Sequence, residues 1–409
     1  MNQIQPPLLT RLRALPRAAW ILFLGTFLNK FGTFVMPFLT LYLTRRGFTL
    51  AQAGIAMSAY GLGSLIASGL GGWLADVIGR RKTIVLSMFS VAFAMMALSQ
   101  SRSLVAIVAA TFMAALTGEL YRPASSALLA DLVPPELSVT AFSAYRMAFN
   151  AGFAFGPATA GFLAERGYFW LFAGDAATSV LFGIIALAML PRAVKVNTIG
   201  GGWVADLKTL ADDREFHRVL FGAFIIGLVF LQISSTFSLH VTHLGFSAAT
   251  YGTILSLNGV LVTFCELPMT TITGRFKPWQ MMALGYFLIA IGFTCNAFAH
   301  SEVALIGCVV LFTFGEMATF PISSAYIAGL APAHLRGRYM GAYALTWSAG
   351  MIVAPQMGLR LLAIGPKTLW LTCGALGLVA TAIAIRGPVK SSNPILPRAG
   401  KPRAVETRS

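Results

Sequence analysis

The sequence predicts an all-α membrane protein of twelve transmembrane helices, arranged as two pseudo-symmetric six-helix bundles with both termini in the cytoplasm. Composition supports this first, because 57% of the 409 residues are hydrophobic and only 11% are charged, against roughly 25% charged in soluble chains. Each crossing needs about 20 apolar residues, so a chain of this length holds about twelve. The second observation is the spacing of the apolar runs, and the third is an internal repeat.

The apolar runs are separated by Gly, Pro or charged residues. They fall at 18–44, 51–75, 83–99, 103–130, 138–164, 169–190, 217–240, 249–272, 281–299, 303–330, 339–362 and 368–386. One long polar connection divides them six and six. We therefore expect a cytoplasmic segment 1–17, a bundle 18–190, a cytoplasmic central loop 191–216, a second bundle 217–386, and a disordered cytoplasmic tail 387–409.

The formal net charge of +16 does not indicate nucleic-acid binding, because the basic residues lie mainly in short gaps between apolar runs. Their excess in alternate gaps orients the chain with both termini inside. The four cysteines lie within apolar runs and lack CxxC spacing, so neither a disulfide framework nor a metal site is expected. The first run shows no cleavage site and reads as a retained span.

The two halves repeat one another. Sliding the chain on itself by 198 residues aligns Gly54 with Gly252, Pro123 with Pro321, Pro134 with Pro332, Gly152 with Gly350, and Pro157 with Pro355. Both copies enter from the same side, which predicts a parallel repeat about an axis along the membrane normal. Proteins built in this way bind their ligands between the halves, near the midplane.

A loop motif stands between the second and third runs, Gly72-Trp73-Leu74-Ala75-Asp76-Val77-Ile78-Gly79-Arg80-Arg81-Lys82. It resembles the loop signature of the major facilitator superfamily, and the twelve runs, the repeat and the central loop resemble that family over the whole chain. The chain departs from the signature at Val77, where the family often has Arg. The resemblance implies a transporter that works by alternating access.

The charges of this motif predict a latch at the cytoplasmic mouth. Asp76 is placed to meet a helix N-terminus in the second half, where the helix dipole is positive. Either Arg80 or Arg81 is placed to reach Asp131, at the inner end of the fourth run. The resemblance implies that this latch breaks when the halves rock. The alternative is that the basic residues only set the topology.

The fifth run carries a helix-packing motif, with Gly152, Gly156, Pro157 and Gly161. Small residues four apart allow helices to approach closely, and the proline bends the helix. The motif resembles an element of the fifth span of antiporters and therefore favours export. Helix packing alone is the alternative explanation.

Ionisable side chains inside the runs are the candidate site, because each costs about 2.5–3.5 kcal/mol to insert and normally faces a cavity or a partner. These residues are Lys30, Glu119, Arg122, Arg146, Asp175, Glu266 and Glu316, with Asn29 as a polar neighbour. Glu119 and Arg122 are three residues apart and share a helical face. The alternative is a neutralised structural network.

Glu316 and Glu119 are the expected proton-coupling residues, because a carboxyl group removed from water holds a proton more readily. Arg122 stands where exporters of the resembled superfamily often have a buried arginine. Those exporters often place an acid in the first span, whereas this chain has Asn29 and Lys30 there. The charge of the substrate is therefore left open.

We expect a proton-coupled exporter of amphipathic drug-like or metabolite molecules in the bacterial inner membrane. The alternatives are a flippase for a lipid or lipid-like molecule, or a proton-coupled nutrient importer of the same fold. An enzyme is not expected, because clustered metal ligands or a nucleophile with its base are not apparent. The expected partners are a small amphipathic substrate, protons and membrane lipids, with no nucleic acid, no metal and no cofactor. The expected energy source is the proton gradient, and the expected state is a monomer.

Overall fold

The computed structural model describes residues 8–134, 137–191, 211–273, 275–332 and 335–387, and these ranges contain helices and no strand. Most of the predicted central loop and the predicted tail lie outside the described residues. The helices are α1 (Leu8–Arg13), α2 (Arg17–Phe31), α3 (Val35–Arg45), α4 (Leu50–Val77), α5 (Arg80–Gln100), α6 (Leu104–Glu119), α7 (Tyr121–Leu132), α8 (Ser138–Arg166), α9 (Phe169–Met189), α11 (Arg214–Phe230), α12 (Gln232–Ser235), α13 (Phe237–His243), α14 (Ala248–Thr273), α15 (Pro278–Cys295), α16 (Glu302–Leu330), α17 (Arg336–Ile364) and α18 (Pro366–Ile385).

Every predicted apolar run corresponds to one of these helices or to a short series of them. Within the described ranges, eleven helical segments are long and apolar enough to cross a membrane. The remaining run is α8, whose 29 residues span about 43 Å at about 1.5 Å per residue. It is less apolar because it carries Arg146 and Asn150 among many small residues. The predicted all-α membrane fold is confirmed, and the cytoplasmic placement of both termini stays a prediction.

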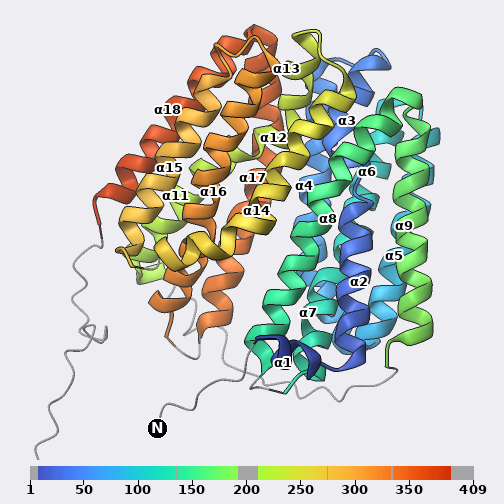
Figure 1. The fold of residues 1–409 in the computed structure, drawn as a ribbon. Coiled ribbons are helices and arrows are strands. Elements are labelled where there is room, and N and C mark those ends of the chain that lie inside the picture. The colour runs from blue at the N-terminus through green and yellow to red at the C-terminus, as the bar shows by residue number, and fades with distance from the viewer. Residues whose placement is uncertain (1–7, 135–136, 192–210, 274, 333–334, 388–409) are drawn as a thin grey trace, which may run out of the picture.

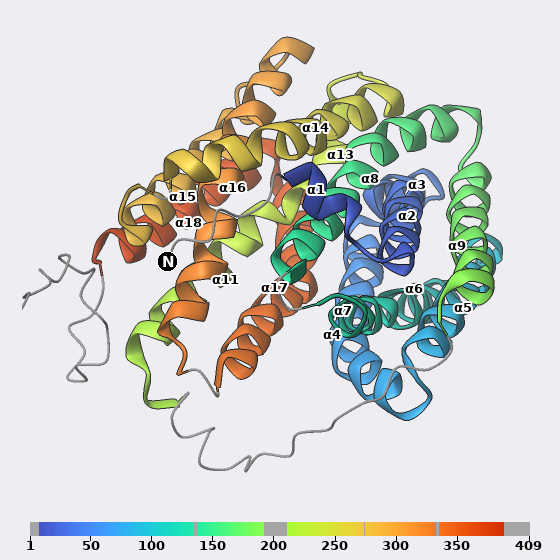
Figure 2. The ribbon, with the colours of Figure 1, turned by 60° about the horizontal axis from the view of Figure 1, so that its bottom comes forward.

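The helices form two groups that lie side by side, α1–α9 in blue to green and α11–α18 in yellow to red (Figure 1). The groups touch along two long seams, α8 with α14 and α4 with α17, and through α3 with α12 and α13. We call the end of the molecule at which α1 lies the α1 face, and the opposite end the α13 face (Figure 1). Figure 2 turns the α1 face toward the viewer.

The two seams are copies of one another at the 198-residue offset. A Cβ at Gly61 of α4 would lie 2.6 Å from the backbone of Met351, and a Cβ at Gly259 of α14 would lie 2.5 Å from Ala154, next to Phe153. Both glycines are therefore required by close helix approach. Thr40 and Ser238, also 198 residues apart, place their hydroxyl oxygens 3.2 Å from each other. The pseudo-two-fold axis passes between such pairs.

The first and seventh spans are discontinuous. The first breaks at Gly32–Phe34, because Pro37 donates no hydrogen bond and crowds the carbonyl four residues before it. The seventh breaks at Leu231 and Thr236, where the amide of buried Gln232 donates to the carbonyls of Leu228 and Ala354, each at 2.9 Å. Transporters commonly use such broken helices around their binding sites.

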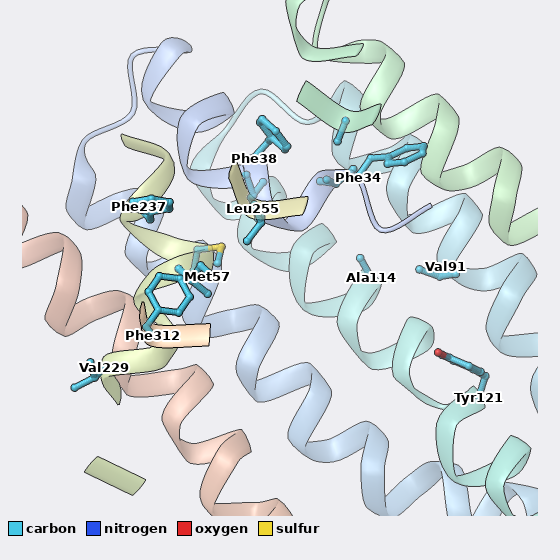
Figure 3. Packing of buried hydrophobic residues seen from close by; sticks show 14 of the residues in the cluster. Phe34, Phe38, Met57, Val91, Ala114, Tyr121, Val229, Phe237, Leu255 and Phe312 are labelled. Carbon is cyan, nitrogen blue, oxygen red and sulfur yellow. The ribbon is translucent and has the colours of Figure 1, made fainter. Parts of the chain in front are cut away.

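Tyr251 of α14 ties the two broken spans together near the α13 face. Its hydroxyl oxygen lies 3.1 Å from the carbonyl oxygen of Pro37 and 3.2 Å from that of Ile233. Its ring contacts Phe38 at 5.0 Å and Phe237 at 6.0 Å between centroids, two residues that belong to the buried cluster of Figure 3. The halves are thus closed by packed aromatic rings at this end.

The α4–α17 seam parts toward the α1 face. Two turns beyond Gly61, nothing lies within 4 Å of a Cβ built at Gly69, and the same holds for Gly341 of α17. The tight contacts along this seam therefore lie in its half nearer the α13 face.

Candidate functional site

Three charged residues of the first half form one network. Lys30, at the end of α2, places its amine 3.6 Å from Glu119, and Arg122 of α7 places a guanidinium nitrogen 3.2 Å from the other oxygen of Glu119. The chain bends between α6 and α7 because Pro123 cannot donate to the carbonyl of Glu119. One carboxylate is thus shared by two cations, which leaves this group one positive charge in excess.

The two cations differ in their exposure. The Lys30 side chain is 9% exposed, and its amine lies over the rings of Phe149 at 5.0 Å and Tyr121 at 5.6 Å. The Arg122 side chain is 54% exposed, with its guanidinium carbon 5.8 Å from the Phe149 ring. A half-exposed guanidinium in a membrane helix faces water rather than lipid. Arg122 therefore lines an aqueous space.

A second ion pair joins the two halves. Arg146 of α8 contacts Glu266 of α14 on the α1 side of their seam. The repeat-related positions in the other seam are Ala344 and Ser68, which carry no charge. The pair therefore bridges only one of the two seams.

Glu316 of α16 has a different environment from Glu119. Its carboxylate accepts a hydrogen bond from the Asn258 amide at 2.7 Å, and the same amide donates to Thr313 at 2.9 Å. Within the part of the chain that the structure describes, no cation pairs with Glu316. Glu266 is close enough for the two carboxyl charges to interact.

Aromatic rings surround the Glu316 side of the site. Phe320 lies one helical turn after Glu316 and so shares its face. Its ring contacts Phe230 at 5.0 Å and Trp347 at 4.9 Å between centroids. All three rings are partly exposed, so they present apolar surface beside the carboxyl group.

The last two predicted residues lie at the break of the first span. Asp175 of α9 is buried and lies near the backbone N–H groups of Phe34 and Val35, at the start of α3, and near Lys30. Asn29 donates to the sulfur of Met88 at 3.7 Å. Asp175 thus interacts both with the break of the first span and with Lys30.

The loop motif lies at the α1 face. Gly79 adopts a φ of +97°, which only glycine tolerates easily, and Gly72 lies nearby in open space. Arg80 pairs with Asp76 and, at 3.3 Å, with Asp131. Arg81 instead donates to the carbonyl of Leu187.

One expectation for this motif is not met in the present arrangement. Asp76 was expected to contact a helix N-terminus of the second half, but its partner is Arg80 of its own half. The halves touch mainly through α8 with α14 and α4 with α17, and the close approaches of α4 to α17, at Gly54 and Gly61, lie toward the α13 face. In this arrangement Asp76 pairs within its own half.

The motif of the fifth span serves both halves. A Cβ at Gly152 or Gly156 would lie 2.6 Å from the backbone oxygen of Phe27 or Phe31, in the first span. A Cβ at Gly161 would lie 2.7 Å from the carbonyl of Ala248, across the seam. Next to Pro157, the Ala158 N–H donates to Ser256 of α14 at 2.8 Å.

Sequence reasoning missed two features. Asn258 escaped notice, although it is a polar residue inside an apolar run and could have been found on that ground. The contacts at the start of α11 were also missed. There Glu215 accepts from Tyr326 at 2.8 Å, and Asp213 accepts from Tyr339 at 2.9 Å. These contacts join the tenth and eleventh spans to the seventh. Their partners lie 111 and 126 residues apart in the chain, so no local sequence pattern predicts them.

Comparison with known proteins places this arrangement in a family. The chain is 25% identical over 388 residues to the multidrug resistance protein MdtH of Proteus mirabilis, covering 91% of this chain and 94% of that protein. It is 24% identical over 394 residues to a Na(+), Li(+), K(+)/H(+) antiporter of Planococcus maritimus, covering 88% and 91%. A crystal structure of the nucleoside transporter NupG has the same fold, with a TM-score of 0.80 at 15% identity over 90% of this chain and 99% of that one. The sequence model of the Major Facilitator Superfamily matches residues 22–355 and 219–407, and the chain therefore belongs to this superfamily of multi-span membrane transporters.

Proposed function

We propose that this chain is a proton-coupled exporter of amphipathic small molecules in the bacterial inner membrane. The names of two relatives, a multidrug resistance protein and a cation/proton antiporter, support export and proton exchange. The proposal rests most directly on one observation, the environment of Glu316.

Glu316 is the residue best suited to exchange a proton. A carboxylate inside a membrane protein is costly unless a cation or a proton neutralises it. Glu119 has two cations, Lys30 and Arg122, and is compensated in place. Glu316 has the neutral amide of Asn258 as its hydrogen-bond donor, so a proton or a cationic group of the substrate can neutralise it. We therefore assign proton coupling to Glu316 and a structural role to Glu119.

Competition at one carboxyl group gives antiport. If a proton and a substrate cation cannot occupy Glu316 together, the arrival of one releases the other, and the proton gradient drives the substrate outward. The halves meet tightly near the α13 face, and we assign this face to the outside on the distribution of basic residues. The site then opens to the cytoplasm, where substrate enters.

Rocking of the halves completes the cycle. The glycine contacts near the α13 face would separate, and the α1 face would close. The cluster of Arg80, Asp76 and Asp131 would then meet the second half and act as the latch that the loop motif predicts. A lipid flippase and a nutrient importer of the same fold are the alternatives. The flippase would need a cation such as Lys30 to bind an anionic lipid headgroup, but Lys30 is already paired with Glu119.

The test uses proteoliposomes with an acidic lumen and an entrapped pH-sensitive dye. Amphipathic compounds of different charge, such as ethidium and norfloxacin, are added outside. An exporter of this kind releases protons from the lumen when a substrate is added. An importer that moves substrate and proton together would acidify the lumen, and a flippase would give no response to any of the compounds.

Glu316→Gln should abolish proton release while the protein keeps its thermal stability. The matched control is Glu302→Gln, an exposed acid at the start of the same helix, which should behave as the unmodified protein. Gradient-driven transport at the normal rate in Glu316→Gln would remove this residue from the mechanism.

A further inference from the structure

The repeat places unlike chemistry at equivalent positions of the two halves. At the 198-residue offset, Arg122 corresponds to Phe320, and Phe149 corresponds to Trp347. The first half has a guanidinium against a phenyl ring, 5.8 Å apart. The second half has two aromatic rings in contact, 4.9 Å apart.

These two pairs face one another across the pseudo-two-fold axis. Contacts such as Thr40 with Ser238, 198 residues apart, show that the axis relates the halves at this offset. Helix positions equivalent under such an axis stand opposite each other around the space between the halves. Arg122 and Phe320 therefore line opposite walls of that space.

The walls also carry opposite charge. On the first wall, Lys30 and Arg122 share the carboxylate of Glu119, which leaves these three side chains one positive charge in excess, and the buried carboxyl group of Asp175 interacts with Lys30. The Arg122 side chain is half exposed, so part of its guanidinium is open to a ligand. On the second wall, Glu316 has only neutral hydrogen-bond partners among the described residues, and Phe320, Trp347 and Phe230 lie beside it.

We infer that the substrate is a zwitterionic amphiphile, with an anionic group that binds Arg122 and a cationic group that binds Glu316. This inference rests on the export function proposed above and names its substrate class. A planar carboxylate or a phosphate matches the forked guanidinium. The apolar body of the substrate lies against Phe149 on one wall and against Phe320 and Trp347 on the other.

The arrangement also explains how such a substrate couples to a proton. Its cationic group competes with the proton for Glu316, whereas its anionic group binds Arg122 whether Glu316 is protonated or not. Arg122 therefore selects the substrate, and Glu316 links its movement to the gradient. A purely cationic compound would meet the half-exposed guanidinium of Arg122 without an anionic group to bind it.

The test measures equilibrium binding to the full-length protein in lipid nanodiscs without a pH gradient. The probes are norfloxacin, which carries a carboxylate and a distant ammonium group, its methyl ester, which keeps only the cation, and its N-acetyl derivative, which keeps only the anion. Norfloxacin should bind at least about tenfold more tightly than either derivative, since each lost contact to a charged group is worth about one order of magnitude.

Variants assign the two ends of the probe. Arg122→Gln should bind norfloxacin and its ester with similar affinity, and Arg122→Lys should keep part of the preference. Glu316→Gln should bind norfloxacin no more tightly than its N-acetyl derivative. Arg360→Gln, which changes an exposed arginine elsewhere on α17, is the control and should change nothing.

Two results would overturn the inference. In the first, the methyl ester binds the unmodified protein as tightly as norfloxacin does. In the second, a folded Arg122→Gln protein still prefers norfloxacin to the ester as strongly as the unmodified protein does. Both leave proton-coupled export intact, because that function is tested by proton release in liposomes rather than by the affinities of the probes.

Discussion

Gly152→Ala tests how closely the fifth span approaches the first. A Cβ at this position would lie 2.6 Å from the carbonyl oxygen of Phe27 and 2.8 Å from the backbone nitrogen of Phe31. Ordinary contacts begin at 3.4 Å, so α8 would have to retreat from α2 by about 0.8 Å. Overpacking of this kind costs about 1–3 kcal/mol, and Gly152→Ala should lower the free energy of unfolding by that amount.

The assay is reversible unfolding in mixed micelles with increasing dodecyl sulfate, followed by tryptophan fluorescence. Gly69→Ala is the matched control, because nothing lies within 4 Å of its Cβ. It should leave stability unchanged or raise it by up to about 1 kcal/mol through helix propensity. Equal stability of Gly152→Ala and the unmodified protein would refute the close approach of α2 and α8.

Two further substitutions test contacts of the site by the same titration. Glu119→Gln should lower the free energy of unfolding by about 3–5 kcal/mol because it leaves buried Lys30 without its carboxylate. Adding Lys30→Met should restore most of that loss. A Glu119→Gln protein as stable as the unmodified one would contradict the pairing. Ser256→Ala should cost about 1–3 kcal/mol because the Ala158 N–H loses its acceptor across the seam. Ser68→Ala, whose hydroxyl bonds to a carbonyl of its own helix, should cost less than about 0.5 kcal/mol, and equal losses in the two serine variants would argue against the seam contact.

The fold could be predicted almost entirely from the sequence, because membrane insertion imposes long apolar runs that are visible without any knowledge of packing. The internal repeat then predicted the division into two halves. The breaks in the spans were harder to foresee. Pro37 marks the first break, but the seventh span breaks at Leu231 and Thr236, on either side of the short helix that begins with Gln232. The amide of Gln232 donates to the carbonyl of Ala354, more than a hundred residues away.

The contacts of the candidate residues could be predicted only in part. The spacing of Glu119 and Arg122 indicated a shared face, and the structure places them 3.2 Å apart. Contacts between different helices, such as Arg146 with Glu266, depend on how each helix is rotated about its axis. No local pattern records that rotation. The distinction between compensated Glu119 and Glu316 therefore appears only in three dimensions.

The central claim is that the halves are closed at the α13 face and must part there for transport. Thr40 and Ser238 stand on either side of that closure, with their hydroxyl oxygens 3.2 Å apart. Replacing both with cysteine should allow a disulfide of about 2.05 Å between the sulfurs. In proteoliposomes, oxidation of the double variant should abolish substrate-driven proton release and reduction should restore it, whereas neither single variant should respond. Transport at the normal rate in fully cross-linked protein would contradict the claim.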